Sequence, residues 1–164
     1  MARERQTRTR WNGKKGVEMA DEKGKRIKVI LRMVQIHDNL EPAWDDEGEF
    51  RFQCTVKSRN RGGIEEKTTL PRKKKFYRIS DNPAWNRLKL DEVLFEGEVD
   101  DHLEVEIIGE ELDQFTPNDQ LDRYHREWEG SPEEWIGIYH PGDEGSSDPE
   151  RMTNWWVYLE IEAA

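Results

Sequence analysis

The chain has 164 residues, of which 34% are hydrophobic and 38% are charged, and its formal net charge at neutral pH is −10. This length fits one domain of ordinary size. No apolar stretch approaches the roughly 20 residues that a membrane-spanning helix needs, and the N-terminal residues lack the apolar core of a secretion signal. The single cysteine, Cys54, excludes an internal disulfide, and no group of cysteines and histidines has zinc spacing. We therefore expect a cytoplasmic protein.

The two halves of the sequence differ in charge. Residues 1–78 carry 21 Lys and Arg against 12 Asp and Glu, a balance of +9, whereas residues 79–164 carry 5 against 24, a balance of −19. Seven tryptophans supply a large apolar area to a sequence that has few aliphatic residues. We expect a folded domain with one positive and one negative region on its surface.

The predicted elements begin after a basic segment. Residues 1–24 are polar and rich in Lys and Arg, so we expect a flexible tail there and one domain over residues 25–164. Residues 27–36 are apolar at most positions of both faces, which is typical of a central strand. Residues 49–57 alternate strictly between apolar and polar, which predicts a strand with one buried face.

Five more strands are expected further along the chain. Their ranges are residues 73–79, 88–95, 103–107, 135–139 and 155–162. Turn signals rich in Gly, Asn and Pro separate them. Seven short strands between turn-rich loops predict an all-β fold, an antiparallel β-sandwich of about seven or eight strands.

One short helix is expected in a loop, over residues 116–129. The Thr-Pro pair that opens this segment suits an N-cap and a first helical position. Leu121, Tyr124 and Trp128 then fall on one face at helical spacing.

Two acidic loops follow predicted strands. The first covers residues 37–49 and the second covers residues 109–119. Loops at one end of a sandwich converge, and carboxylates that lie close together raise one another's pKa unless a cation lies between them. Calcium suits such a site because it takes about 6–8 oxygen ligands with loose geometry. The alternative is that both loops are ordinary solvated surface.

A basic cluster occupies the predicted strand 73–79. Its cationic side chains include Lys73, Lys74, Lys75 and Arg78. Each basic residue near an anionic phospholipid surface contributes about 1 kcal/mol to binding. Phosphates of nucleic acid are a second candidate, although the overall acidity of the chain argues against them. A third interpretation is that lysines on an edge strand prevent aggregation between sheets.

The residues give little support for catalysis. His37 and Asp38 are neighbours in sequence, but no serine or cysteine is tied to them. Cys54 lies on the apolar face of its strand, so we expect a small buried hydrophobe rather than a nucleophile. We expect a binding module that is not an enzyme.

One segment resembles a known family. Residues 81–86 (Asp-Asn-Pro-Ala-Trp-Asn) are similar to the Asn-Pro-x-Trp-Asn element of C2-type domains, and residues 103–107 resemble the family strand that leads into a calcium loop. The resemblance covers about residues 26–120. It implies an eight-stranded sandwich that binds calcium and an anionic phospholipid or protein partner, located peripherally at a membrane.

The resemblance also implies site residues. Calcium would be bound by Asp45, Asp46, Glu111, Asp113 and Asp119. The anionic partner would be bound by Lys73, Lys74, Lys75 and Arg78.

Two other functions stay open. A metal-free interaction or assembly subunit would use Trp156, Tyr158 and the opposed charges to dock protein partners or further copies of the chain. A carbohydrate-binding sandwich would instead stack sugar rings on Trp44, Trp85 or Trp128.

Overall fold

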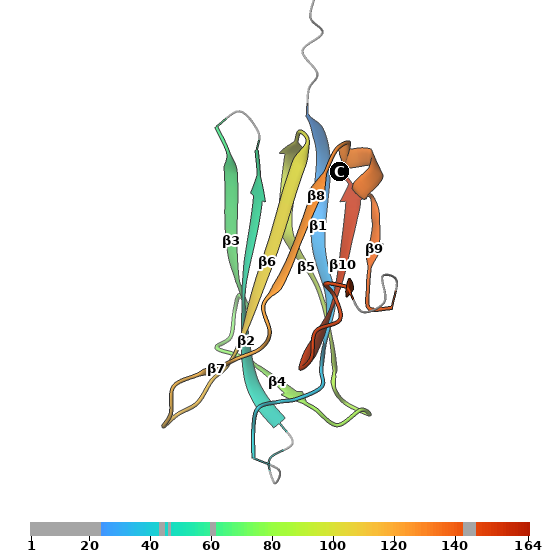
Figure 1. Ribbon diagram of the computed structural model, residues 1–164. Helices are drawn as coiled ribbons and strands as arrows, with labels where there is room; N and C mark the ends of the chain where they lie inside the picture. The colour runs from blue at the N-terminus through green and yellow to red at the C-terminus, as the bar shows by residue number, and fades with distance from the viewer. Residues whose placement is uncertain (1–23, 43–44, 46, 60–61, 143–146) are drawn as a thin grey trace, which may run out of the picture.

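The computed structural model describes residues 24–42, 45, 47–59, 62–142 and 147–164. Within them the protein is a sandwich of two antiparallel β-sheets (Figure 1). This confirms the all-β sandwich expected from the sequence. Apart from Gly24, the expected basic tail over residues 1–24 lies outside the described residues, as do Trp44 and Asp46. No helix in the described part is long and apolar enough to cross a membrane.

The first sheet, sheet A, has the strand order β5-β1-β10-β9. Its strands are β1 (Lys25–Ile36), β5 (Arg87–Val99), β9 (Gly137–Tyr139) and β10 (Trp155–Ala163). β1 is the central strand that its two apolar faces predict, because it pairs antiparallel with both β5 and β10. The register of both pairings shifts between Leu31 and Met33, which leaves Arg32 at the irregularity.

The second sheet, sheet B, is built around β2 and β6. Its strands are β2 (Glu47–Ser58), β3 (Ile64–Leu70), β4 (Tyr77–Ser80), β6 (His102–Glu111), β7 (Asp119–Gln120) and β8 (Tyr124–Glu129). β3 and β4 pair with one edge of β2, and β7 and β8 pair with the far edge of β6. The described residues thus form ten strands, of which β4, β7 and β9 are short.

The core lies between the two sheets. Phe50, Phe52, Cys54 and Val56 are at most 2% exposed, which confirms the buried face predicted for residues 49–57. Phe52 of sheet B stacks on Trp155 of sheet A, with ring centroids 5.5 Å apart. Large rings in contact across the sandwich supply the apolar burial that a sequence with few aliphatic residues needs.

The helix expected over residues 116–129 is wrong. The segment forms β7 and β8 instead. In β8, Tyr124 and Trp128 face the core while His125 and Glu127 are exposed, which is a period of two. Pairing with the open edge of β6 satisfies the backbone and buries both rings, so it prevails over the local helical preference. The only helix in the described part is the short 3-10 helix η1 (Pro132–Trp135), which precedes β9.

The basic cluster lies mainly in a loop, which corrects the strand expected over residues 73–79. β3, which was not expected, ends at Leu70, and β4 begins only at Tyr77. The intervening bend runs over the edge of the sandwich, where Arg72 donates to the carbonyl of Val93 on β5 at 2.7 Å. Three lysines of the cluster are therefore exposed on a loop rather than alternating on a strand: Lys73, Lys74 and Lys75.

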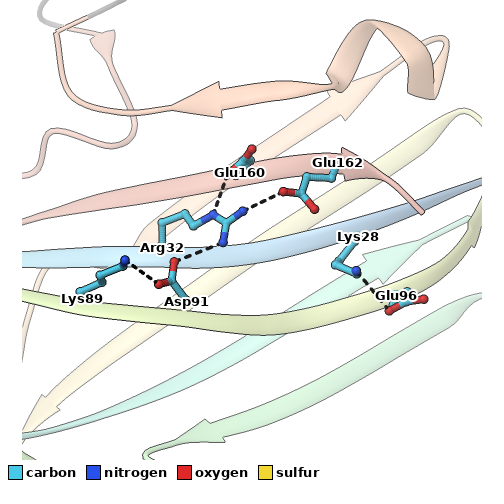
Figure 2. A network of polar contacts seen from close by, with 7 residues as sticks. All are labelled: Lys28, Arg32, Lys89, Asp91, Glu96, Glu160 and Glu162. Carbon is cyan, nitrogen blue, oxygen red and sulfur yellow. Dashed lines mark hydrogen bonds and ion pairs between the residues drawn. The ribbon is translucent and has the colours of Figure 1, made fainter.

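Charges from the two halves of the sequence interleave on the outer face of sheet A. Arg32 on β1 contacts Glu160 and Glu162 on β10 at 2.6 Å and 2.7 Å (Figure 2). It also contacts Asp91 on β5 at 3.2 Å. Antiparallel pairing places β1, from the basic half, between two strands from the acidic half. The expectation of separate positive and negative regions is therefore wrong for this face.

Candidate functional site

Three loops lie at one end of the sandwich, the lower end in Figure 1. They connect β1 to β2, β4 to β5, and β6 to β7. The strand ends that carry them are hydrogen-bonded to one another. The N–H of Ile36 donates to the carbonyl of Asn86 at 2.9 Å, and the N–H of Leu112 donates to the carbonyl of Glu49 at 2.8 Å. The loops meet because their strands are neighbours.

Asn39 organises the β1–β2 loop. Its side chain is buried, its Nδ2 donates to the carbonyl of Asp45 at 3.1 Å, and its Oδ1 accepts from the N–H of Glu41 at 3.1 Å. Leu40 takes a positive φ of 63°, and its N–H donates to Oδ1 of Asp38 at 2.9 Å. These contacts fix the backbone conformation around Glu41. They therefore limit the positions that its carboxylate can occupy.

The β6–β7 loop is closed by its own side chains. The N–H of Asp113 donates to Oδ1 of Asn118 at 3.2 Å, and the hydroxyl of Thr116 donates to Oδ2 of Asp113. β7 then pairs back on β6, with Asp119 opposite Glu111. This closure keeps Asp113 next to the end of β6.

Three carboxylates from these two loops and the end of β6 form a cluster. Oxygen atoms of Glu41, Glu111 and Asp113 lie within 4.8 Å of one another. Glu111 is 1% exposed, and its Oε1 accepts from the N–H of Glu49 at 3.4 Å. Burial, followed by a hydrogen bond with Glu41, raises the pKa of Glu111 to about 7. The cluster therefore holds a proton near neutral pH that a metal cation would displace.

A cleft of about 300 Å³ opens beside the cluster. Its lining consists of Glu41, Asp45, Glu47, Glu49, Arg78, Leu112, Asp113, Gln114 and Phe115. Arg78 is the only cationic residue among the described residues of this lining, and its guanidinium lies 3.3 Å from the carboxylate of Glu49. Five acidic side chains against one guanidinium give the cleft a negative potential.

The structure brings together some of the predicted calcium ligands. Glu111 and Asp113 belong to the carboxylate cluster, and Asp45 lines the adjoining cleft. Asp119 is exposed on β7 and, as far as the described residues go, belongs neither to the cluster nor to the cleft lining. Asp46 lies outside the described residues.

Glu41 is the cluster member that the sequence did not single out. It lies in the first acidic loop, five residues after Ile36, the last apolar residue of the strand predicted before that loop. Nothing in the local pattern distinguishes it from its acidic neighbours. Its position in the cluster depends on the fold of the loop, in which the N–H of Glu41 donates to the buried side chain of Asn39. Residue spacing alone does not predict this contact.

Two large apolar side chains are exposed on loops at the same end. Phe115 of the β6–β7 loop is 96% exposed, and Trp85 of the β4–β5 loop is 76% exposed. The N–H of Trp85 donates to the carbonyl of Asn82 at 2.8 Å, so the Asn-Pro-Ala-Trp segment forms a turn that presents the indole ring to solvent. Exposed rings at the end of the sandwich that carries the acidic cleft are suited to binding rather than to core packing.

The predicted cationic contacts separate into two groups. Lys73, Lys74 and Lys75 are exposed in the β3–β4 loop, and the Lys74 ammonium lies 4.8 Å from the centre of the Tyr77 ring. Arg78 lies on β4 and lines the acidic cleft. Arg78 thus faces carboxylates, whereas the three lysines face solvent.

The aromatic residues considered for other partners lie in different surroundings. Trp128 is buried, which removes it from the set of sugar-stacking candidates and leaves Trp85 as the exposed one in the described part of the chain. Trp156 is half-buried under His37, with ring centroids 4.3 Å apart, and under the guanidinium of Arg151 at 5.3 Å. The hydroxyl of Tyr158 donates to the amide oxygen of Gln35 at 3.1 Å. Both rings are therefore half-buried and in contact with neighbouring side chains.

Cys54 is confirmed as a buried side chain of the core. It is 2% exposed, and burial raises the pKa of its thiol to about 12. A thiol in this environment stays protonated at physiological pH.

No family model matches the chain, and no curated protein matches it at a significant level. A functional conclusion therefore depends on the geometry of the loop end.

Proposed function

We propose that the protein is a non-catalytic binding module whose acidic loop end binds Ca²⁺ and then contacts an anionic phospholipid surface. The observation that carries the proposal is the cluster of Glu41, Glu111 and Asp113, which two separate loops and a strand end bring together. The resemblance of residues 81–86 and of the acidic loops to C2-type domains supports the same function.

The residues at the loop end fit Ca²⁺. The cluster offers three carboxylates, and the cleft adds that of Asp45, so all the available ligands are oxygen atoms. No histidine or cysteine occurs in the described lining of the cleft. Ca²⁺ takes about 6–8 oxygen ligands, including carboxylates, backbone carbonyls and water. This set suits a hard cation and offers nothing to a thiophilic metal.

Ca²⁺ binding would change the charge of the loop end. In the metal-free state, burial and the hydrogen bond with Glu41 keep Glu111 protonated up to about pH 7. A divalent cation would replace the proton and offset most of the charge of the three carboxylates. The cleft would then repel an anionic headgroup less strongly.

Phe115 and Trp85 would make the apolar contact with the membrane. Both rings are exposed on loops at the end of the sandwich that carries the acidic cleft, where they can enter the headgroup region as the loops approach it. The exposed Lys73, Lys74 and Lys75 would add about 1 kcal/mol each by attraction to anionic lipid.

Sedimentation with lipid vesicles tests this proposal. The full chain is mixed with vesicles of phosphatidylcholine alone or with phosphatidylserine, in Ca²⁺ or in chelator. We expect binding only to the phosphatidylserine vesicles with Ca²⁺, and we expect the double variant E41Q/D113N to lose it. D119N is the matched control and should bind like the wild type. Binding that is unchanged by chelator, or equal for E41Q/D113N and wild type, contradicts the proposal.

A metal-free protein-interaction module is the second candidate. The proton held by Glu111 and the ion pair between Arg78 and Glu49 relieve part of the charge of the cleft without any metal. In that case Phe115 and Trp85 would contact a protein surface. The absence of any Ca²⁺ effect on vesicle binding or on thermal stability would favour this candidate.

A further inference from the structure

A second group of ionisable side chains lies on the outer face of sheet B. It comprises His102 and Glu104 on β6 and His125, Glu127 and Glu129 on β8. The register pairs His102 with Glu129 and Glu104 with Glu127. Because alternate residues of paired strands share a face, all five side chains project from the same side of the sheet.

Three of these side chains have the spacing of metal ligands. Nε2 of His125 lies 3.2 Å from Oε1 of Glu104 and 3.4 Å from Oε1 of Glu127, and the three atoms lie within 4.8 Å of one another. A tetrahedral zinc site with bonds of about 2.1 Å separates its ligand atoms by about 3.4 Å. The strands therefore already hold these donors at nearly that separation.

His102 approaches the same carboxylate from the other side. Its Nε2 lies 3.8 Å from Oε2 of Glu127, and with Glu127 and Glu129 it forms a second set of donors within 4.8 Å. The side chain is 5% exposed, and its Nδ1 has no hydrogen-bond partner. Buried imidazoles are normally fixed by hydrogen bonds on the ring nitrogens. The Nε2 atom of this cavity-lining ring faces the carboxylate of Glu127 and is the nitrogen placed to bind a ligand.

A cavity of about 510 Å³ gives access to this group. His102, Glu104 and Glu127 line it, and Gly62 and Gly63 of the β2–β3 turn also belong to its wall.

In the described part of the chain, the ion pairs around the cavity leave Glu127 without a lysine or arginine partner. Lys57 lies 3.5 Å from Glu104, and Arg59 lies 3.6 Å from Glu129. Among the described residues, the ion-pair partners of Glu127 are the two histidines.

We propose that Glu104, His125 and Glu127 bind one divalent transition-metal ion of the Zn²⁺ class, with His102 as a further nitrogen ligand from the cavity wall. Imidazole with carboxylate suits Zn²⁺, Ni²⁺ or Cu²⁺, whereas Ca²⁺ and Mg²⁺ prefer oxygen ligands alone. This site is separate from the acidic loop end, because it lies on β6 and β8 near the β2–β3 turn and contains nitrogen ligands. The two sites would therefore select different ions.

Calorimetric titration of the full chain with Zn²⁺ tests the site. We expect one Zn²⁺ ion per chain, displaced by a chelator, and affinity at least about tenfold weaker in H125Q and in E127Q. H140Q is the matched control, because His140 is exposed on the other sheet, and D113N controls for the acidic loop end. Both controls should bind Zn²⁺ like the wild type. No Zn²⁺ binding, or equal affinity for H125Q and H140Q, overturns the proposal.

The imidazole nitrogen resonances of the wild type give a second readout that needs no variant. On addition of Zn²⁺, we expect the Nε2 signals of His125 and His102 to shift in step with metal binding, while those of His140 do not. A shift of His125 without one of His102 removes His102 from the ligand set. A shift of neither histidine overturns the site. Circular dichroism of H125Q and E127Q shows that a loss of affinity does not result from unfolding.

Discussion

The carboxyl group of Glu41, on the β1–β2 loop, shares a hydrogen bond with that of Glu111, at the end of β6. Such a bond requires a proton, and burial of Glu111 favours the protonated form. The folded state therefore holds this proton up to about pH 7, whereas the unfolded chain releases it near the ordinary glutamate pKa of 4.5. It follows that Glu111 stabilises the metal-free fold at low pH and that this contribution is lost as the pH rises through about 7.

The substitution Glu111→Gln tests this linkage. An amide keeps a donor for Glu41 and carries no charge, so at pH 8 the metal-free variant should be more stable than the wild type by on the order of 1–3 kcal/mol. At pH 4 the two proteins should have nearly equal free energies of unfolding, because the wild-type carboxyl is then protonated in the folded state and mostly protonated in the unfolded state. Urea unfolding in chelator at both pH values measures the difference. A variant that is less stable than the wild type by the same amount at both pH values contradicts the account.

A buried ion pair fastens β8 to the segment before β10. Nη1 of Arg126 lies 3.0 Å and 2.9 Å from the two carboxylate oxygens of Glu150, which is 1% exposed, and the hydroxyl of Tyr124 donates to Glu150 at 2.9 Å. Burial, together with a hydrogen bond with Asp148, raises the pKa of Glu150 to about 7 in spite of this guanidinium. Arg126→Met should reduce stability by about 3 kcal/mol at pH 8, because it leaves a buried carboxylate without its cation.

The loss in R126M should be smaller at pH 5, where Glu150 is protonated and needs no cation. The double variant R126M/E150Q is the control, and it should recover most of the stability at pH 8. Guanidinium unfolding of the three proteins measures this. Equal destabilisation at both pH values would show that the packing of the Arg126 side chain, rather than its charge, matters.

The exposed rings at the loop end should affect binding without affecting stability. Phe115→Ala and Trp85→Ala should each weaken Ca²⁺-dependent binding to phosphatidylserine vesicles by about tenfold, through loss of buried apolar area. Their melting temperatures should match that of the wild type, because exposed substitutions change stability little. Ile138→Ala is the control, since Ile138 is 62% exposed on β9 of sheet A. If I138A weakens vesicle binding as much as F115A, the loop end is not the contact surface.

The three lysines of the β3–β4 loop should contribute by long-range attraction. Replacing Lys73, Lys74 and Lys75 together by Gln should weaken vesicle binding by roughly 1 kcal/mol for each charge at low salt. The difference from the wild type should shrink as salt is added, because screening shortens the range of the attraction. Lys89→Gln serves as a single-site control on β5. A loss that is independent of salt would rule out this electrostatic role.

Much of the fold is readable from the sequence, and the exceptions have physical causes. The strict alternation of residues 49–57 identifies β2, because only one of its faces is buried. The sequence of β8 favours a helix because Arg126, which faces inward to reach Glu150, interrupts the apolar period of the strand. β3 was missed because Ile64–Leu70 is an edge strand in which few side chains are buried.

The candidate site was predictable to a smaller extent. Glu111 and Asp113 follow a clear strand, so their position at a sheet end could be foreseen. Glu41 belongs to the cluster and Asp119 does not, and this difference depends on contacts between loops that are distant in sequence. The group around His125 was not foreseen either, because its ligands alternate on two strands, of which one was assigned to a helix.

Calorimetric titration with Ca²⁺ tests the central claim most directly. The wild type and D119N should each bind Ca²⁺ with the same affinity, and E41Q should lose most of that affinity, because Glu41 belongs to the cluster and Asp119 does not. The affinity of the wild type should increase as the pH rises through about 7, since Ca²⁺ competes with the proton of Glu111. Absence of Ca²⁺ binding at any pH, or a loss in D119N as large as that in E41Q, would contradict the account.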